Sequence, residues 1–488
     1  MTSLRSRIAL AIALTVAFYT LAVAIALGLI VLPIVVWAAE GRGNIWVAIA
    51  LIGAGIAILR AIVPERARFA APGPELGRDA QPRLRALLDE VAHTVGDRPP
   101  EKVYLDLDVN ASVLEHRGER IMLLGLPLVS VLAEDELRAV VAHEHGHYVA
   151  GDTRFSSWIW RTRVAVLKAV HELVGSESWF RRSVLSWPFR GYALLFLRLT
   201  NAVSRRQEFA ADALSARVTS ADAAGRALRR INAVAPLWDM FWNEDVVPML
   251  QSRRRPPLSA GLVRMLTGRA ISGVLETPVP GDMAAGEPDP YASHPTLGQR
   301  LEALGVPVDP SVPSKPEKTA ITLLDDVAEL ERQLLETQFG QEVRGLEVAD
   351  WQDAAEVHHS VLQQDVERFG AVLGSRTLGE AGEAAAALAD LREPLRAAAG
   401  ADADVPAEDL DGLALRVLGA AVACAAVRAG AELSALPGEP LLLRTAAGEL
   451  DVWGRLTPIA TGAQPPAEWT AQPVVAALRA EPLVQTAT

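Results

Sequence analysis

Cysteine is almost absent from this chain of 488 residues, since Cys424 is its only one. One cysteine cannot form an internal disulfide, and it cannot build a cysteine-based zinc site. Cys424 lies in an apolar run over residues 420–426, where the ordinary interpretation is a small buried residue of a helix. Any metal site in this protein must therefore use histidine and carboxylate ligands.

Positive charge is also scarce. The chain has 47 Lys and Arg against 59 Asp and Glu, which gives a formal net charge of −12. This balance does not favour a nucleic-acid partner, and we expect none. Lysine is rare while Ala, Leu, Val, Arg and Gly dominate, a bias typical of GC-rich bacterial genomes. We therefore expect a bacterial protein.

Charged residues are missing from residues 8–39, a longer run than the roughly 20 residues that span a bilayer. Residues 40–44 contain two glycines and polar side chains suited to a turn. A second apolar run covers residues 45–63, where Arg60 can extend its charge to the interface. The pattern predicts a transmembrane helical hairpin over residues 1–63, in contact with the lipid bilayer.

A cleaved signal peptide is the alternative interpretation of this segment. The apolar core of a signal peptide is usually about half as long as the first run of this chain. A signal peptide is also not followed at once by a second apolar run, as the first run is here. The hairpin is therefore favoured. The cations that flank the two runs are Arg5, Arg7, Arg60, Arg66 and Arg68. By the positive-inside rule they predict a cell-membrane protein with two spans, whose following domain is cytoplasmic.

Proline marks the boundaries in the rest of the chain. Residues 64–80 have the composition of a linker, and four prolines fall within residues 307–316. We expect one domain over residues 64–306 and an Ala/Glu-rich domain of unknown function over residues 317–488. Period-two alternation predicts short strands near residues 103–108, 110–113 and 120–126, and a hairpin near residues 441–444 and 450–453. Helical periodicity dominates elsewhere, so the expected fold is mainly α (α+β).

The run His143-Glu144-His145-Gly146-His147 carries the clearest chemistry in the sequence. It lies on a predicted helix that opens with three acidic residues, which suit the helix dipole. Residues four apart share a helix face, so His143 and His147 can reach one ion. Glu144 lies beside a water on that ion and can act as its general base. His145 points to the other side, and we expect it not to be a ligand.

A hydrolytic zinc site needs a third protein ligand and one open position. Glu208 and Asp212 lie four residues apart and share a helix face. Glu208 can bind the metal while Asp212 accepts a hydrogen bond from the far nitrogen of a ligand imidazole. Such a pair alone is usually a solvated helix face, and the His-Glu-x-x-His run raises the pair to a candidate.

Three sequence blocks in this order resemble the M48 family of membrane zinc peptidases, which includes HtpX-like and CAAX prenyl protease-related enzymes. The blocks are His143-Glu144-His145-Gly146-His147 with Gly151-Asp152, Ser204-Arg205-Arg206-Gln207-Glu208-Phe209-Ala210-Ala211-Asp212, and Ser293-His294-Pro295-Thr296 with Gln299-Arg300-Leu301. Asn110-Ala111 is similar to an element of the strand that lines the family's cleft. The resemblance covers residues 1 to about 305.

The resemblance implies a zincin-type catalytic domain with a small edge sheet and one Zn²⁺ per chain. It makes Glu208 the third ligand and has Asp212 orient His143. His294 would face the cleft and help to stabilise the tetrahedral oxyanion, although a helix-start residue before a proline is the alternative. Arg300, like Asp152, would be structural through hydrogen bonds or ion pairs.

We therefore expect a membrane-anchored zinc metalloendopeptidase (EC 3.4.24 type) that hydrolyses polypeptide substrates. The family's usual role is membrane-protein quality control or processing. An extended substrate would pair with an exposed strand edge near residues 120–125. The broken apolar segments of residues 155–203 are expected to be amphipathic helices rather than further spans.

Two other functions remain open at this point. The chain could process specific substrates such as prenylated proteins, but two spans are few for the large chamber of those relatives. It could instead be a membrane scaffold or regulatory binding protein with a structural or latent zinc site. Glu144 argues against the scaffold, because a structural site has no use for a general base.

Overall fold

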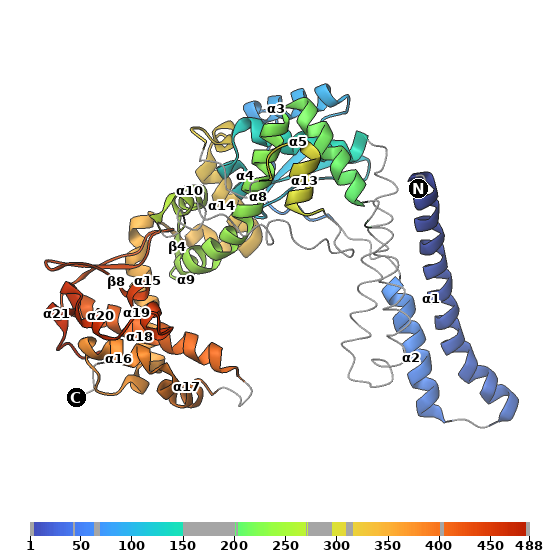
Figure 1. The fold of residues 1–488 in the computed structure, drawn as a ribbon. Coiled ribbons are helices and arrows are strands. Elements are labelled where there is room, and N and C mark those ends of the chain that lie inside the picture. Colours follow the sequence, from blue (N-terminus) through green and yellow to red (C-terminus); the bar gives the residue numbers. More distant parts are fainter. Residues whose placement is uncertain are drawn as a thin grey trace. The chain divides into compact units, whose positions relative to one another are not determined.

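The computed structural model describes residues 4–41, 44–62, 69–149, 201, 204–269, 271, 295–308, 316–400 and 405–484. Predictions for residues 155–203, Asp152 and His294 lie outside the described residues. The chain divides into two compact units, whose main helices and strands are labelled in Figure 1. The first comprises Met1–Asp106, Asn110–Asn232 and Pro278–Asp325, and the second comprises Leu107–Val109, Ala233–Thr277 and Asp326–Thr488. Both are mainly helical with small sheets, which confirms the predicted fold class.

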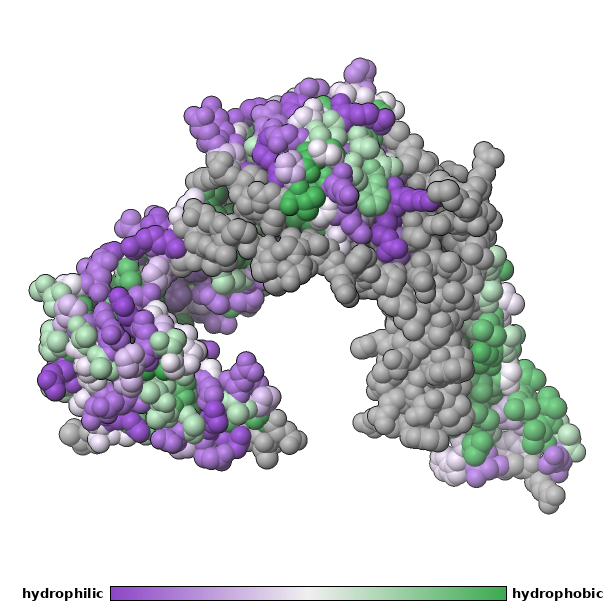
Figure 2. Space-filling model, in the orientation of Figure 1, coloured by the Kyte–Doolittle hydropathy of each residue, from purple (hydrophilic) through white to green (hydrophobic). Residues whose placement is uncertain are grey.

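The N-terminal segment forms two contacting helices, α1 (Leu4–Glu40) and α2 (Ile45–Ile62). They approach closely at Gly55, where an added Cβ would lie 2.6 Å from the backbone oxygen of Ala26. Tyr19–Glu40 is long and apolar enough to cross a membrane, and α2 is a shorter apolar helix. Large apolar side chains are exposed on the outside of this pair, where Figure 2 shows patches of hydrophobic surface.

A three-stranded sheet supports the candidate site. Its strands are β1 (Lys102–Asp106), β2 (Ala111–His116) and β3 (Glu119–Gly125), in the order β1-β3-β2. β3 is parallel to β1 and antiparallel to β2. A two-residue turn joins β2 to β3, with φ of 53° at Arg117 and 88° at Gly118, as a type I′ hairpin requires.

The predicted substrate edge near residues 120–125 is therefore wrong, because β3 lies in the middle of the sheet. On the far side of β1, Leu76 donates from its backbone nitrogen to Val103 O at 2.7 Å. No strand among the described residues pairs with the outer side of β2. Within the described part of the chain, the open edge of this sheet is thus β2.

Helix α5 (Glu134–Val149) carries the His-Glu-x-x-His run, where the sequence predicts a helix. Its buried Glu136 accepts a hydrogen bond from Ala133 N at 2.9 Å, which satisfies a donor at the helix start. The same carboxylate pairs with Arg230 and Arg226 of α8 (Ala221–Phe241). These ion pairs fasten the N-terminal end of α5 to α8.

Other helices of the first unit cover the sheet and complete the core. α3 packs against α5, and α4 packs against β3 and against η3. Their bounds are α3 (Pro82–Val95), α4 (Leu126–Val131), α13 (Leu297–Leu304) and η3 (Ala320–Leu323). A further helix covers residues 204–218.

Apart from Leu107–Val109, the second unit starts within α8 and joins residues from both sides of the predicted boundary near residue 310. Glu331, buried on α14 (Val327–Phe339), accepts hydrogen bonds from the backbone nitrogens of Leu258 and Ser259 at 3.0 and 2.8 Å. It therefore caps α10 (Leu258–Thr267). The Trp351 indole covers Gly261, where an added Cβ would lie 2.3 Å from the ring. Long-range contacts thus tie residues expected in the catalytic domain to the C-terminal residues.

The C-terminal core surrounds α18 (Ala407–Arg428), an apolar helix that is 67% buried over its most hydrophobic window and is thus a core helix by its burial. Cys424 is buried in it, and burial raises the pKa of its thiol to about 11. The predicted hairpin is confirmed as β7 (Leu442–Thr445) and β8 (Gly448–Asp451). Trp469 is fully buried and donates from its indole nitrogen to Leu378 O at 2.8 Å.

Most of the remaining elements of the second unit are short. They are η2 (Trp242–Val246), α9 (Val247–Gln251), β4 (Arg254–Arg255), η4 (Gln341–Gly345), β5 (Glu347–Val348), η5 (Trp351–Asp353), α15 (Ala354–Phe369), η6 (Gly370–Leu373), η7 (Leu378–Glu380), α16 (Ala381–Ala386), η8 (Leu388–Leu391), α17 (Arg392–Ala399), β6 (Glu432–Ser434), α19 (Val452–Ala460), α20 (Ala467–Thr470) and α21 (Pro473–Leu478). β4 and β5 form a parallel pair, and β6 adds to the β7–β8 hairpin.

Candidate metal centre

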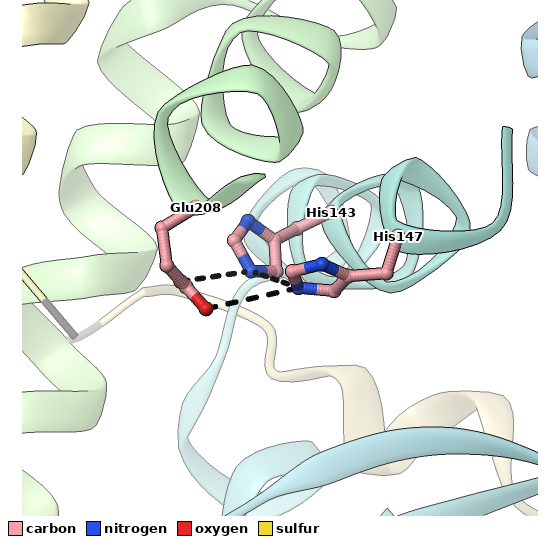
Figure 3. Close-up of side chains that lie close together, drawn as sticks. All are labelled: His143, His147 and Glu208. Atoms are coloured by element: carbon pink, nitrogen blue, oxygen red, sulfur yellow. Dashed lines mark hydrogen bonds and ion pairs between the residues drawn. The ribbon is translucent and has the colours of Figure 1, made fainter. Parts of the chain in front are cut away.

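Two helices bring the three predicted ligands together, as Figure 3 shows. His143 and His147 project from one face of α5, one turn apart, and Glu208 projects towards them from the helix of residues 204–218. The Nε2 atom of His143 lies 3.3 Å from Nε2 of His147 and 3.5 Å from a Glu208 carboxylate oxygen. The second Glu208 oxygen lies 3.9 Å from His147 Nε2.

These separations suit one small cation. Ligand atoms about 2.0–2.2 Å from a tetrahedral zinc ion lie roughly 3.3–3.6 Å from one another. The three donors here are all within 4.8 Å of one another, and their closest pairs fall in that range. Two imidazoles and one carboxylate are also the donor set of catalytic zinc sites. The group can therefore hold a metal ion.

Asp212 fixes the orientation of the first imidazole. It lies one helical turn after Glu208, and its Oδ1 atom is 2.9 Å from Nδ1 of His143. This contact places the proton of His143 on Nδ1 and leaves Nε2 to face the other two ligands. The Asp212 side chain is only 4% exposed, so water does not compete for this bond.

Arg300 closes the site from a third element, α13. The helix starts with a capping box between Thr296 and Gln299 and ends at Gly305, whose φ of 71° favours glycine. Arg300 donates to both oxygens of Asp212, at 2.8 and 2.6 Å. The prediction of an ion pair for Arg300 is confirmed, but the sequence does not reveal that its partner is Asp212.

The charges of these groups shift their pKa values in different directions. Burial lowers the pKa of His143, but the bond to Asp212 and the charge of Glu144 outweigh it and hold the pKa above its usual value. Burial and the neighbouring His143 lower the pKa of His147 to about 4. Burial raises the pKa of Asp212, but hydrogen bonds from Arg300 and His143 hold it below its usual value. A neutral imidazole at His147 and an ionised Asp212 are the forms that suit metal binding.

The site opens on the side of His147. The His147 side chain is 33% exposed, against 13% for His143 and 9% for Glu208. Glu144 is partly exposed and close enough to His143 for its charge to raise the pKa of that imidazole. A water molecule and a substrate can therefore approach the ligands from the side where His147 is exposed, while the other two ligands stay covered.

Gly146 sets how closely the two ligand helices approach. An alanine Cβ at this position would lie 2.9 Å from Cα and 3.0 Å from Cβ of Ala211. Ala211 lies between Glu208 and Asp212 on the facing helix. The glycine inside the His-Glu-x-x-His run is therefore a site residue that sequence reasoning missed, and its small size was the available signal.

His145 lies away from the ligands, as predicted. Its side chain is 1% exposed, and its Nδ1 atom is 2.8 Å from a carboxylate oxygen of Asp97. Arg120 of β3 pairs with the same Asp97 and stacks over the ring of Tyr148, 4.6 Å from its centroid. The far side of α5 is thus held to the sheet. The oxyanion role of His294 stays a prediction, because that residue is outside the described part of the chain.

A His-Glu-x-x-His helix joined by a carboxylate from a second helix is the metal-binding arrangement of a large class of metallopeptidases. Comparison with known families agrees. Residues 78–307 match the model of peptidase family M48, which confirms the predicted family resemblance over this part of the chain.

Curated relatives point the same way at low identity. The chain is 27% identical over 190 residues to a "Protease HtpX homolog" of Nostoc sp. strain PCC 7120, covering 36% of this chain and 56% of the relative. A relative of the same name from Trichormus variabilis gives the same values. A third, from Nostoc punctiforme, is 24% identical over 202 residues, covering 38% and 59%. The chain thus spans a little over half the length of the curated relatives it matches.

Proposed function

We propose that this protein is a membrane-anchored, zinc-dependent endopeptidase that acts in membrane-protein quality control or processing. The observation that carries the proposal is the convergence of His143, His147 and Glu208, with a partly exposed Glu144 next to His143 on the same helix. A structural zinc site would have four protein ligands and no general base. One zinc ion per chain is the expected cofactor.

Glu144, Asp212 and His143 have separate roles in the proposed peptide hydrolysis. When bound, zinc supplies Lewis acidity that polarises the scissile carbonyl group and acidifies the attacking water. Glu144 accepts the proton of that water and passes it to the leaving amine. Asp212 keeps the Nδ1 proton of His143 in place, so that Nε2 stays available as a ligand.

We expect the purified protein to cleave casein or an unfolded membrane protein only when zinc is present. Glu144→Gln should lower the cleavage rate by about 10²–10⁴-fold, because it removes the general base. Its zinc content should be unchanged, because Glu144 is not one of the three ligands. A zinc-loaded wild type that cleaves nothing, or a variant as active as wild type, would refute the proposal.

We also propose that α1 and α2 anchor the chain in the bilayer, with the peptidase domain in the cytoplasm. The apolar outer surface of the two helices and the flanking arginines support this orientation. The protein should stay with membranes washed at alkaline pH. Digestion of the peptidase domain in right-side-out vesicles, where the cytoplasmic face is sealed inside, would contradict the orientation.

The open edge of β2 is the proposed binding surface for an extended substrate. β2 packs against α5, which carries both histidines, and begins with the Ala111 of the cleft-like element. Gly125 N donates to Asn110 O at 2.9 Å. In an antiparallel pair every second residue is hydrogen-bonded to the neighbouring strand, so Asn110, Ser112 and Leu114 direct their backbone groups at β3. The intervening residues, Val113 among them, present backbone N–H and C=O groups to the open side.

Val113→Pro should raise KM for an unfolded polypeptide by about 10-fold, the effect of roughly one lost hydrogen bond of 1.4 kcal/mol. Proline removes an outward N–H there without breaking the bonds to β3. Val113→Ala keeps the N–H and is the matched control, with a KM near wild type. Equal KM values for both variants, at equal thermal stability, would exclude strand pairing at this edge.

A further inference from the structure

Arg300 makes more contacts at the site than an ion pair with Asp212 requires. Its Nη2 atom donates to Asp212 Oδ1 at 2.6 Å and lies 3.5 Å from Glu208 Oε2. The same nitrogen is 3.5 Å from Nδ1 of His143. One guanidinium nitrogen thus faces a candidate ligand on each of two helices, as well as the residue that orients one of them.

We infer that Arg300 is a positioning residue of the metal centre. It holds Glu208 and Asp212 together, so that Glu208 faces the metal and Asp212 faces His143. The inference rests on the proposed metal site. It assigns to Arg300 a role in metal affinity and geometry, beyond fold stability.

Electrostatics explains why a cation is needed between these groups. Glu208 and Asp212 project from adjacent turns of one helix, and their side chains are only 9% and 4% exposed. Two buried carboxylates this close repel each other, and the repulsion would drive one away from the site. Arg300 is itself 16% exposed and lies against both. Its charge offsets the repulsion where solvent cannot.

The element that carries Arg300 is itself firmly placed. Leu301 is 1% exposed and packs against Gly225 of α8, where an added Cβ would lie 3.5 Å from a Leu301 methyl group. Val306 packs on the same glycine, at 3.0 Å. The guanidinium group therefore extends from a short helix that is capped at both ends and docked on α8, and it can impose a position on its partners.

Shape matters as well as charge. The planar guanidinium meets Asp212 with two parallel hydrogen bonds, from Nε at 2.8 Å and from Nη2 at 2.6 Å, and Nη2 still faces Glu208. A lysine ammonium is a single point of charge and cannot reproduce this fork. Arg300→Lys should therefore keep the charge and lose the alignment.

Arg230 offers a matched control in the same unit. It donates to both oxygens of Glu136, at 2.9 and 3.1 Å, and its side chain is 6% exposed. This buried two-point pair also fastens α5, but at the end far from the histidines. Arg230→Lys therefore reports the stability cost of the same chemical change without touching the candidate ligands.

The test compares full-length wild type, Arg300→Lys and Arg230→Lys. Zinc affinity is measured by chelator competition, and ligand geometry by the visible absorption of the Co²⁺-loaded proteins. We expect Arg300→Lys to bind zinc about 10–100-fold more weakly, the usual cost of losing an outer partner of a ligand. Its Co²⁺ spectrum should change and its kcat should fall more than its KM rises. Arg230→Lys should keep wild-type affinity and spectrum at a comparable loss of thermal stability.

A second variant keeps the inference testable if Arg300→Lys does not fold. Arg300→Gly should regain zinc affinity when guanidinium chloride is added at millimolar concentration, because the ion can occupy the vacated position. Unchanged affinity and spectrum in Arg300→Lys would overturn the inference and leave the peptidase proposal intact. A wild type that binds zinc but cleaves nothing, beside an Arg300→Lys protein with weakened affinity, would refute the peptidase and leave the inference standing.

Discussion

Gly146→Ala should lower zinc affinity by more than about 100-fold and abolish peptidase activity. The added Cβ would lie 2.9 Å from Cα of Ala211, a backbone atom that cannot move without its helix. A metal site tolerates deviations of only about 0.2 Å in its ligand distances. Separating the helices enough to relieve the clash would withdraw Glu208 from the ion and Asp212 from His143 together.

Helix propensity alone would predict that Gly146→Ala stabilises α5, the opposite of the loss expected here. Alanine is about 1 kcal/mol better than glycine inside a helix, so a loss of function cannot be ascribed to a weaker α5. Gly412→Ala is the matched control, because Gly412 lies within α18 with nothing inside 4 Å of the added Cβ. It should leave zinc binding unchanged and stabilise its helix slightly. Normal zinc affinity in Gly146→Ala would show that the helix contact does not set the site.

Trp469→Ala should destabilise the C-terminal core by about 3–5 kcal/mol, the range for deletion of a large buried aromatic side chain. Trp469 is fully buried, and its indole hydrogen bond to Leu378 O would be lost with it. Gly382 packs so closely that an added Cβ would lie 2.6 Å from Trp469 Cβ, so backbone lies against the ring and cannot readily collapse into the cavity. Denaturant unfolding followed by hydrogen exchange of residues 405–484 measures the loss.

Phe339→Ala provides the comparison for this prediction. Phe339 is a large aromatic residue of the same unit, but its side chain is 52% exposed and it stacks on Trp242. It buries less area, so its removal should cost about 1 kcal/mol or less. Equal losses in the two variants would mean that Trp469 does not fill an essential part of the core.

The sequence could group the candidate metal ligands by helix face because that geometry is local. His143 and His147 share a face by helical periodicity alone, and Glu208 and Asp212 do so for the same reason. The distance between the two pairs is a tertiary property. It depends on the contact of Gly146 with Ala211 and on Arg300, which lies 88 residues beyond Asp212 in the chain. Local periodicity carries no information about such contacts.

The order of the strands could not be predicted from the sequence for a similar reason. A period-two pattern identifies residues 120–126 as a strand but does not say which strands flank it. β3 is central because it pairs in parallel with β1 and antiparallel with β2, to which a tight turn joins it. The prolines of residues 307–316 likewise mark a local break, whereas the second compact unit is defined by contacts such as Trp351 on Gly261.

The cap on α10 has a consequence for how a gene encoding this chain can be cut or joined. Leu258 and Ser259 belong to the segment matched by the peptidase family, but the carboxylate that satisfies their backbone nitrogens comes from Glu331, beyond that segment. A chain that stopped at the proline-rich junction would leave these donors without Glu331 and strip Trp351 from Gly261. The residues beyond the junction are therefore not a detachable appendage, because they complete the packing of α10. A gene cut at this junction would encode a fragment in which α10 lacks both its cap from Glu331 and the cover of Trp351.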